Sequence, residues 1–126
     1  MKIASVAFVV LLLTSCGGRE KVSESAPAAI PGAPGDPARG QILVVQYGCQ
    51  RCHVIPGVKG PQGRSGPVLT GMGTRQLING KIPNTPENMV RWLLNPQAMD
   101  PNTAMPGSGA TPEDARDMSA FMFTLK

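Results

Sequence analysis

The feature that most constrains this chain is the segment Cys49-Gln50-Arg51-Cys52-His53. The spacing C-x-x-C-H is typical of a covalent attachment site for haem, in which two thiols add across the two vinyl groups of the porphyrin. The histidine that follows can bind the iron from one side of the ring through its imidazole. We therefore expect Cys49, Cys52 and His53 to hold one covalent haem c, around which the rest of the chain folds.

Two other uses of the paired cysteines fit the sequence less well. A redox-active dithiol of the thioredoxin kind expects a strand–helix–strand context, and none is visible around the motif. A structural zinc site expects four cysteine or histidine ligands. Cys16 is the only other cysteine and His53 the only histidine, so such a set cannot be assembled. The sequence thus favours haem attachment.

The N-terminal residues read as a targeting signal. The apolar run from Ile3 to Leu13 is too short to span a bilayer and is typical of a signal-peptide core. It ends in Leu13-Thr14-Ser15-Cys16, which is similar to the lipobox of bacterial lipoproteins, whose cysteine is acylated. An ordinary secretory signal with a chance cysteine is the alternative. We expect residues 1–15 to be a lipoprotein signal peptide and Cys16 to anchor the exported protein on the periplasmic or extracytoplasmic side of a membrane.

The remaining chain divides into a tether and one small domain. Residues 16–37 mix proline, glycine and alanine with charges, a composition that cannot bury a core. About 20 such residues reach about 25 Å on average. Residues 38–126 form the candidate domain. A domain this short buries little surface and is usually stabilised by disulfides, a metal or a cofactor.

The first predicted helix follows Asp36-Pro37, an N-cap with a proline at the first helical position. It should cover 38–47 and bury Ile42 and Val45, with Val44 as a further candidate. Because the run is β-branched and apolar, a strand is the alternative.

Two later segments repeat the cap-plus-proline start. Thr85-Pro86-Glu87 opens a helix that stops before Pro96, and Thr111-Pro112-Glu113-Asp114 opens a terminal helix. The apolar residues of the first are Met89, Val90, Leu93 and, as a weaker candidate, Trp92. Those of the second are Ala115, Met118, Phe121, Met122 and Leu125. Residues 54–73 are rich in glycine and proline and should be loop, with a short helix over 74–78. No strand is expected, so the predicted fold is all-α and loop-rich.

If the haem belongs to a closed electron carrier, its iron needs a second axial ligand, and this must come from a side chain other than histidine. Because His53 is the only histidine, bis-histidine ligation within the chain is excluded. Candidate sulfur ligands are Met72, Met89, Met99, Met105, Met118 and Met122. Met105 is favoured because the prolines around it stiffen the backbone, and Met99 is its main rival.

Taken together, residues 38–126 resemble a class I c-type cytochrome. The resemblance implies the small class I cytochrome c fold, with His53 as proximal and Met105 as distal ligand of the iron. It implies four further haem contacts: a proline carbonyl that accepts the N–H of the histidine (Pro67), an apolar residue on the ring (Leu69), an aromatic near the methionine (Trp92) and a hydroxyl near a propionate (Thr103). It also implies that the first and last helices cross at Gly40.

Two stretches, 66–70 and 84–97, resemble more narrowly the cytochrome domain fused to subunit II of bacterial haem-copper oxidases. Those subunits also carry membrane helices and a dinuclear copper domain, for which this chain has neither the length nor the ligands. We therefore expect a stand-alone lipoprotein relative.

With both axial positions filled, the resemblance implies an electron carrier rather than an enzyme. Electrons would come from a quinol-oxidising complex or a dehydrogenase and pass to a terminal oxidase of a respiratory chain. The alternatives are a haem subunit of a periplasmic dehydrogenase and a haem protein with an open gas-binding or catalytic site.

Charge bears on the choice of partner. There are 12 lysines and arginines against 8 acidic residues, without the basic cluster or aromatic ladder that nucleic-acid binding would need. Basic residues expected in loops around the haem are Arg51, Lys59, Arg64, Arg75 and Lys81, whereas Glu113, Asp114 and Asp117 cluster on the last helix. Such a basic rim would steer docking to an acidic partner, although these can also be ordinary solvated charges.

Overall fold

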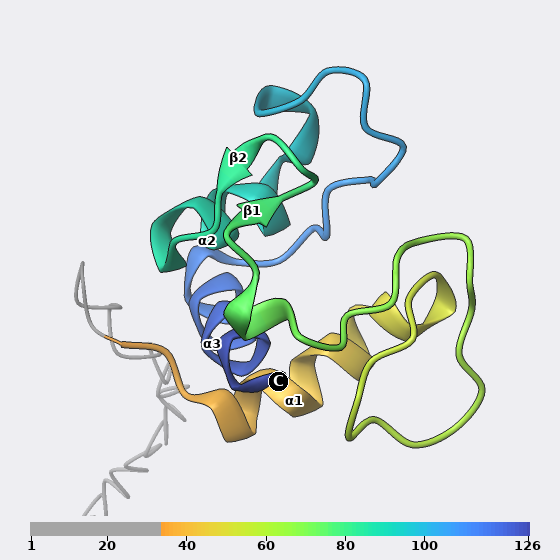
Figure 1. Cartoon of the computed structure of the whole chain (residues 1–126). Coiled ribbons are helices and arrows are strands. Elements are labelled where there is room, and N and C mark those ends of the chain that lie inside the picture. The colour runs from red at the N-terminus through yellow and green to blue at the C-terminus, as the bar shows by residue number, and fades with distance from the viewer. Residues whose placement is uncertain (1–33) are drawn as a thin grey trace, which may run out of the picture.

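A computed structural model describes residues 34–126 (Figure 1). The predicted signal peptide, the lipidated cysteine and most of the tether lie outside the described residues. In chain order the elements are α1 (Pro37–Gln46), η1 (Cys49–Arg51), η2 (Met72–Thr74), β1 (Leu77–Ile78), β2 (Ile82–Pro83), α2 (Pro86–Leu94), η3 (Pro96–Ala98) and α3 (Pro112–Thr124), where η marks a single 3-10 turn. Between residues 34 and 126, no helix is long and apolar enough to cross a membrane.

Each α-helix begins where the sequence predicts it. The side chains of Asp36, Thr85 and Thr111 accept hydrogen bonds from backbone N–H groups of the first helical turn, at 2.9 to 3.2 Å. A proline follows each cap, where its missing N–H has no helical partner to lose. The helices predicted after these three caps are confirmed, and the alternative of a strand over 42–45 is wrong.

The buried face of α1 differs from the prediction. Val44 is buried as expected, but Ile42 and Val45 are 59% and 41% exposed. Gly40 and Leu43 are buried instead, at i and i+3 beside Val44 at i+4. The apolar run covers more than one face of the helix, so periodicity does not choose between them. The choice follows from where the neighbouring helix can approach.

That approach occurs at Gly40, where α1 crosses α3. A Cβ atom built on Gly40 would lie 2.0 Å from the carbonyl oxygen of Asp117, so the two backbones are in contact. Only a residue without a side chain permits this distance. The crossing position suggested by the family resemblance therefore lies at the helix contact in the structure.

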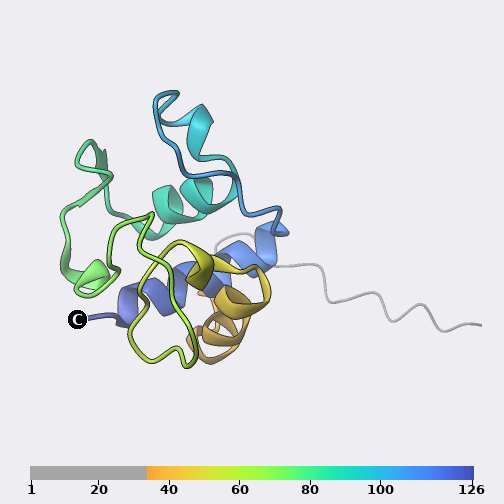
Figure 2. The same cartoon turned by 90° about the vertical axis from the view of Figure 1, so that its right-hand side faces the viewer.

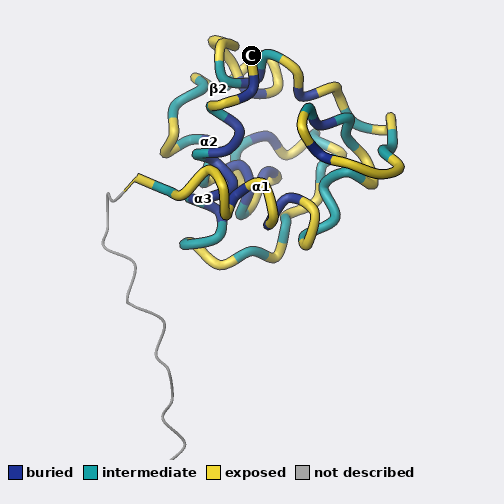
Figure 3. The backbone as a smooth tube through the Cα atoms, turned by 90° about the horizontal axis from the view of Figure 1, so that it is seen from below, coloured by how far each residue is buried: buried dark blue, intermediate teal, exposed yellow. Residues whose placement is uncertain are grey.

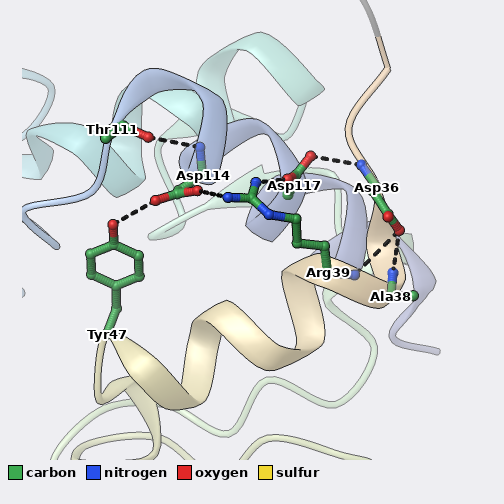
Figure 4. Close-up of polar contacts among 7 residues, drawn as sticks. All are labelled: Asp36, Ala38, Arg39, Tyr47, Thr111, Asp114 and Asp117. Carbon is green, nitrogen blue, oxygen red and sulfur yellow. Dashed lines mark hydrogen bonds and ion pairs between the residues drawn. The ribbon is translucent and has the colours of Figure 1, made fainter. Parts of the chain in front are cut away.

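A chain of polar contacts also joins α1 to α3 (Figure 4). Arg39 forms ion pairs with Asp114, at 2.5 Å, and with Asp117. Tyr47 donates its hydroxyl to Asp114 at 2.7 Å, and the backbone N–H of Asp36 donates to Asp117 at 2.7 Å. Two carboxylates on α3 thus fix both ends of α1.

A small hairpin separates the first helix from the second, where a short helix over 74–78 and no strand had been expected. Strands β1 and β2 pair antiparallel, with Ile78 opposite Ile82. Asn79 and Gly80 have φ angles of 50° and 68°, and the N–H of Lys81 closes the turn on the carbonyl of Ile78 at 3.1 Å. Asn-Gly favours this left-handed turn, so the helix prediction is wrong for a local reason.

The core lies where the three helices meet (Figure 3). Its helical members are Leu43, Val44, Met89, Trp92, Leu93, Ala115, Met118, Phe121 and Met122. The predicted apolar face of α3 is confirmed, whereas Val90 of α2 is only partly buried. Figures 1 and 2 show two long irregular segments that extend from this core, one after η1 and one after α2.

Candidate haem site

A cavity of about 530 Å³ lies between these two irregular segments. All eight residues proposed from the sequence line it: Cys49, Cys52, His53, Pro67, Leu69, Trp92, Thr103 and Met105. They come from η1, the following loop, α2 and the segment before α3, which are distant in the sequence. The fold therefore brings together the whole proposed set.

The attachment motif follows α1 without a linker. Gly48 has a φ of 73° and reverses the chain, after which Cys49–Arg51 form the turn η1. The backbone N–H groups of Cys52 and His53 both reach the carbonyl of Cys49, at 3.2 and 3.0 Å. Burial raises the pKa of the Cys49 thiol, whereas a redox-active dithiol needs a thiol with a lowered pKa.

The imidazole of His53 is oriented by the loop that follows it. Its Nδ1 lies 2.7 Å from the carbonyl oxygen of Pro67. Because a carbonyl only accepts, Nδ1 carries the proton and Nε2 is left with a lone pair for a metal. A Cβ on Gly66 would lie 2.5 Å from His53 Cε1, so glycine makes room for the ring.

The glycine-rich loop is held to the motif by backbone hydrogen bonds. The N–H of Gly63 donates to Gln50, that of Gly66 to Cys52 and that of Leu69 to Val54, at 2.7 to 2.9 Å. Irregular backbone needs such partners when it is not solvated. These hydrogen bonds hold the loop in place, so that it forms one wall of the cavity.

On the other wall, the sulfur of Met105 accepts a hydrogen bond from Trp92 Nε1 at 3.1 Å. The carbonyl of Met105 accepts from Gln97 at 2.6 Å, and its N–H donates to the hydroxyl of Thr103 at 3.3 Å. Its rival Met99 packs against the core and is not among the lining residues.

Three other methionines line the cavity as well: Met72, Met89 and Met122. All three are buried, at 7%, 2% and 4% exposure, and belong to the apolar core. Met105 differs from them because it lies in an irregular segment, only partly buried, with donors on both its sulfur and its carbonyl.

Sequence reasoning missed several lining residues. Arg75 had been assigned only to the rim, yet it lines the cavity and its guanidinium donates to the carbonyls of Val68 and Thr70, at 2.7 and 2.9 Å. Asn79 lines the cavity from the hairpin turn. The Asn-Gly dipeptide was the signal that could have revealed that turn.

The residues present fit a covalently bound haem. The cavity has the size of a cofactor site and is largely apolar, with two thiols and an imidazole on one wall and a thioether on another. Within residues 34–126, no three histidine, cysteine or acidic side chains gather as a metal-ion site would need. An imidazole nitrogen and a thioether sulfur are both ligands that haem iron takes in proteins.

Comparison with known proteins agrees with this geometry. The family model for cytochrome c matches residues 37–126. Cytochrome c oxidase subunit 2 of Alkalihalophilus pseudofirmus is 28% identical over 89 residues, which cover 70% of this chain and 25% of the relative. The same subunit of Bacillus sp. strain PS3 is 32% identical over 82 residues, covering 62% of this chain and 23% of the relative.

The chain thus spans about a quarter of the length of the curated relatives that it matches. The family match, by contrast, covers the whole described domain from the start of α1. The helical fold and the attachment motif agree with it, which confirms the predicted small class I cytochrome c fold. The chain therefore belongs to the cytochrome c family, whose members hold haem c covalently and transfer electrons.

Proposed function

We propose that the protein is a membrane-anchored, mono-haem cytochrome that carries single electrons to a terminal oxidase of a respiratory chain. The observation that carries this proposal is that His53 and Met105 line the same cavity. An iron with both axial positions filled has no place for a substrate, which favours electron transfer over catalysis.

The roles of the chain's own residues follow from their contacts. Haem, when bound, supplies the one-electron couple of its iron. Cys49 and Cys52 would hold it by thioether bonds, and the carbonyl of Pro67 fixes the tautomer of His53. Leu69 lines the cavity with an apolar side chain that is only 8% exposed and would pack against the ring.

As a ligand, the thioether of Met105 would favour ferrous iron more than a second imidazole would, and so would raise the potential. The N–H of Trp92 would strengthen this preference, because its hydrogen bond draws electron density from the sulfur. A raised potential suits a carrier that accepts electrons from a quinol-oxidising complex or a dehydrogenase.

Ligation by Met105 is tested by two matched alanine variants. Met105→Ala should abolish the weak sulfur-to-iron charge-transfer absorption and lower the midpoint potential, while the haem stays attached. Met99→Ala should change neither, because Met99 packs against the core rather than into the cavity. The opposite pattern would show that Met99, and not Met105, is the ligand.

A terminal oxidase is proposed as acceptor because the relatives named above are oxidase subunits.

Fewer residues contribute free positive charge to the proposed basic rim than the five that the sequence suggests. Lys81 is paired with Asp100 at 3.0 Å, and Arg75 is bonded to loop carbonyls. Of the five, Arg51, Lys59 and Arg64 are exposed and have no such partner within residues 34–126. Copurification of an oxidase from native membranes would support this partner, whereas a dehydrogenase would favour the subunit alternative.

Anchoring through Cys16 remains our proposal from the lipobox-like sequence. Several acyl chains anchor a protein stably, whereas a single chain binds only marginally. Intact mass of the native protein should show loss of 1–15 and acyl chains on Cys16. A soluble mature form that begins at another residue would contradict lipidation and would leave the proposal for the haem site unaffected.

A further inference from the structure

Asp100 joins the hairpin turn to the segment that leads to Met105. Its carboxylate is only 6% exposed, although it is charged. Asn79 Nδ2 donates to Oδ2 at 2.6 Å and Lys81 Nζ donates to the same oxygen at 3.0 Å. The other oxygen accepts the N–H of Asn102 at 3.2 Å. Each carboxylate oxygen therefore has a partner, and two of the donors come from the turn between β1 and β2.

Both segments that Asp100 joins reach the cavity. Asn79 lines it from the turn, and Thr103 and Met105 line it from the other segment. The carbonyl of Asp100 accepts the N–H of Thr103 at 3.0 Å. The hydroxyl of Thr103 in turn accepts the N–H of Met105 at 3.3 Å. A short relay of hydrogen bonds thus runs from the turn to the backbone of Met105.

The hairpin cannot supply this rigidity alone. Each strand has two residues, and an isolated two-stranded hairpin is marginal in water. A buried carboxylate is costly unless paired. Asn79, Lys81 and Asp100, here called the Asp100 clamp, therefore hold one another in place.

We propose that the Asp100 clamp positions the sulfur of Met105 and so sets the fraction of molecules in which that sulfur is bound to iron. The inference rests on the proposed ligation by Met105. With the clamp intact, the segment that carries Met105 is fixed against the turn. With the clamp broken, this segment can leave the cavity while Cys49, Cys52 and His53 keep the haem.

The amino group of Lys81 offers the cleanest perturbation. Its side chain is 61% exposed, so Lys81→Met removes the charge without opening the core. Lys126→Met makes the same chemical change on an exposed lysine outside both segments and serves as the matched control. Asp100→Asn removes the charge on the other side of the pair.

The measurement is the affinity of the haem-loaded, full-length ferric protein for imidazole, together with the sulfur-to-iron absorption. Imidazole binds only where the sulfur has left the iron, so its apparent affinity reports that fraction. Because Lys81 is largely exposed, its ion pair is worth about 0.5–1 kcal/mol, so Lys81→Met should raise the affinity about two- to fivefold. The absorption should weaken in parallel, and Lys126→Met should behave as the unaltered protein.

A double variant of Lys81→Met and Asp100→Asn should add little to either single change, because both break one clamp. If Lys81→Met leaves imidazole affinity unchanged, the clamp does not position Met105; this holds even where Asp100→Asn fails to fold. Met105→Ala separates the two proposals. If it changes neither affinity nor absorption, the proposed ligation fails; if it changes both while Lys81→Met matches Lys126→Met, only the clamp fails.

Discussion

Substitution of Gly40 by alanine sets two effects of opposite sign against each other. In a helix interior, alanine is normally more stable than glycine by about 1 kcal/mol. Here the added Cβ would lie 2.0 Å from the carbonyl oxygen of Asp117, where ordinary contacts begin at 3.4 Å. Phe121 Cβ, at 2.9 Å, prevents a sideways escape. The helices would have to separate by more than about 1 Å, which forfeits a quarter to a half of the dispersion energy at that contact.

Overpacking of this kind costs about 1–3 kcal/mol, and separation also loosens Leu43 and Val44. Because the clash is with backbone, we take the upper end of this range, about 3 kcal/mol. After the propensity gain of about 1 kcal/mol is subtracted, Gly40→Ala should lower the free energy of unfolding by about 2 kcal/mol. For a domain of this size that corresponds to a fall in Tm of about 10 °C. Denaturant titration of the haem-loaded protein, followed by circular dichroism, measures both the midpoint and the slope.

The matched control is Ala38→Gly, an exposed position in the first turn of the same helix. It isolates the propensity effect and should cost no more than about 1 kcal/mol. A Gly40→Ala protein as stable as the unaltered one, or more stable, would refute the claim that the backbones of α1 and α3 touch at this glycine.

Three further outcomes are expected. Trp92→Phe removes the N–H donor to the thioether sulfur and should lower the midpoint potential by about 20–40 mV, equivalent to about 0.5–1 kcal/mol; an unchanged potential in a redox titration speaks against that hydrogen bond. The hydrogen bond from Tyr47 and the charge of Arg39 lower the pKa of Asp114, so its stabilisation is present above about pH 4 and is lost as pH falls through the folded-state pKa. Asp114→Asn should flatten the acid limb of the stability curve below pH 4, and a curve of unaltered slope would contradict this. Neutralising Lys59 and Arg64 together should flatten the salt dependence of electron transfer to the proposed oxidase partner, since exposed charges are screened beyond about 10 Å at 0.1 M salt. A transfer rate that does not depend on salt in the unaltered protein would show that these charges do not steer docking.

Features with local causes were predictable from the sequence. The three helix starts depend on a capping side chain and the proline beside it, both readable within four residues. The buried face of α1 was not predictable, because Ile42 and Leu43 are equally apolar and only the close approach at Gly40 selects between them. The hairpin was overlooked although Asn79 and Gly80 signalled it.

The residues of the candidate haem site likewise include some that the sequence predicts and some that it does not. The attachment motif is contiguous, so its residues could be assigned before any fold was known. The choice of Met105 over Met99 depended on flanking prolines and on the family resemblance rather than on distance. The clamp of Asn79, Lys81 and Asp100 could not be predicted, because it pairs side chains that lie about twenty residues apart through a hairpin that the sequence analysis did not predict.

We propose that a methionine sulfur closes the iron of this protein and that the haem serves electron transfer. Absorption spectra of the native protein, recorded in the ferric state and in the ferrous state with and without carbon monoxide, distinguish a closed iron from an open one. A closed iron should give one haem per chain, a sulfur-to-iron charge-transfer band in the ferric spectrum, and a ferrous spectrum that carbon monoxide leaves unchanged at neutral pH. Rapid carbon monoxide binding to the ferrous haem, together with absence of the charge-transfer band, would show an open site and refute ligation by methionine.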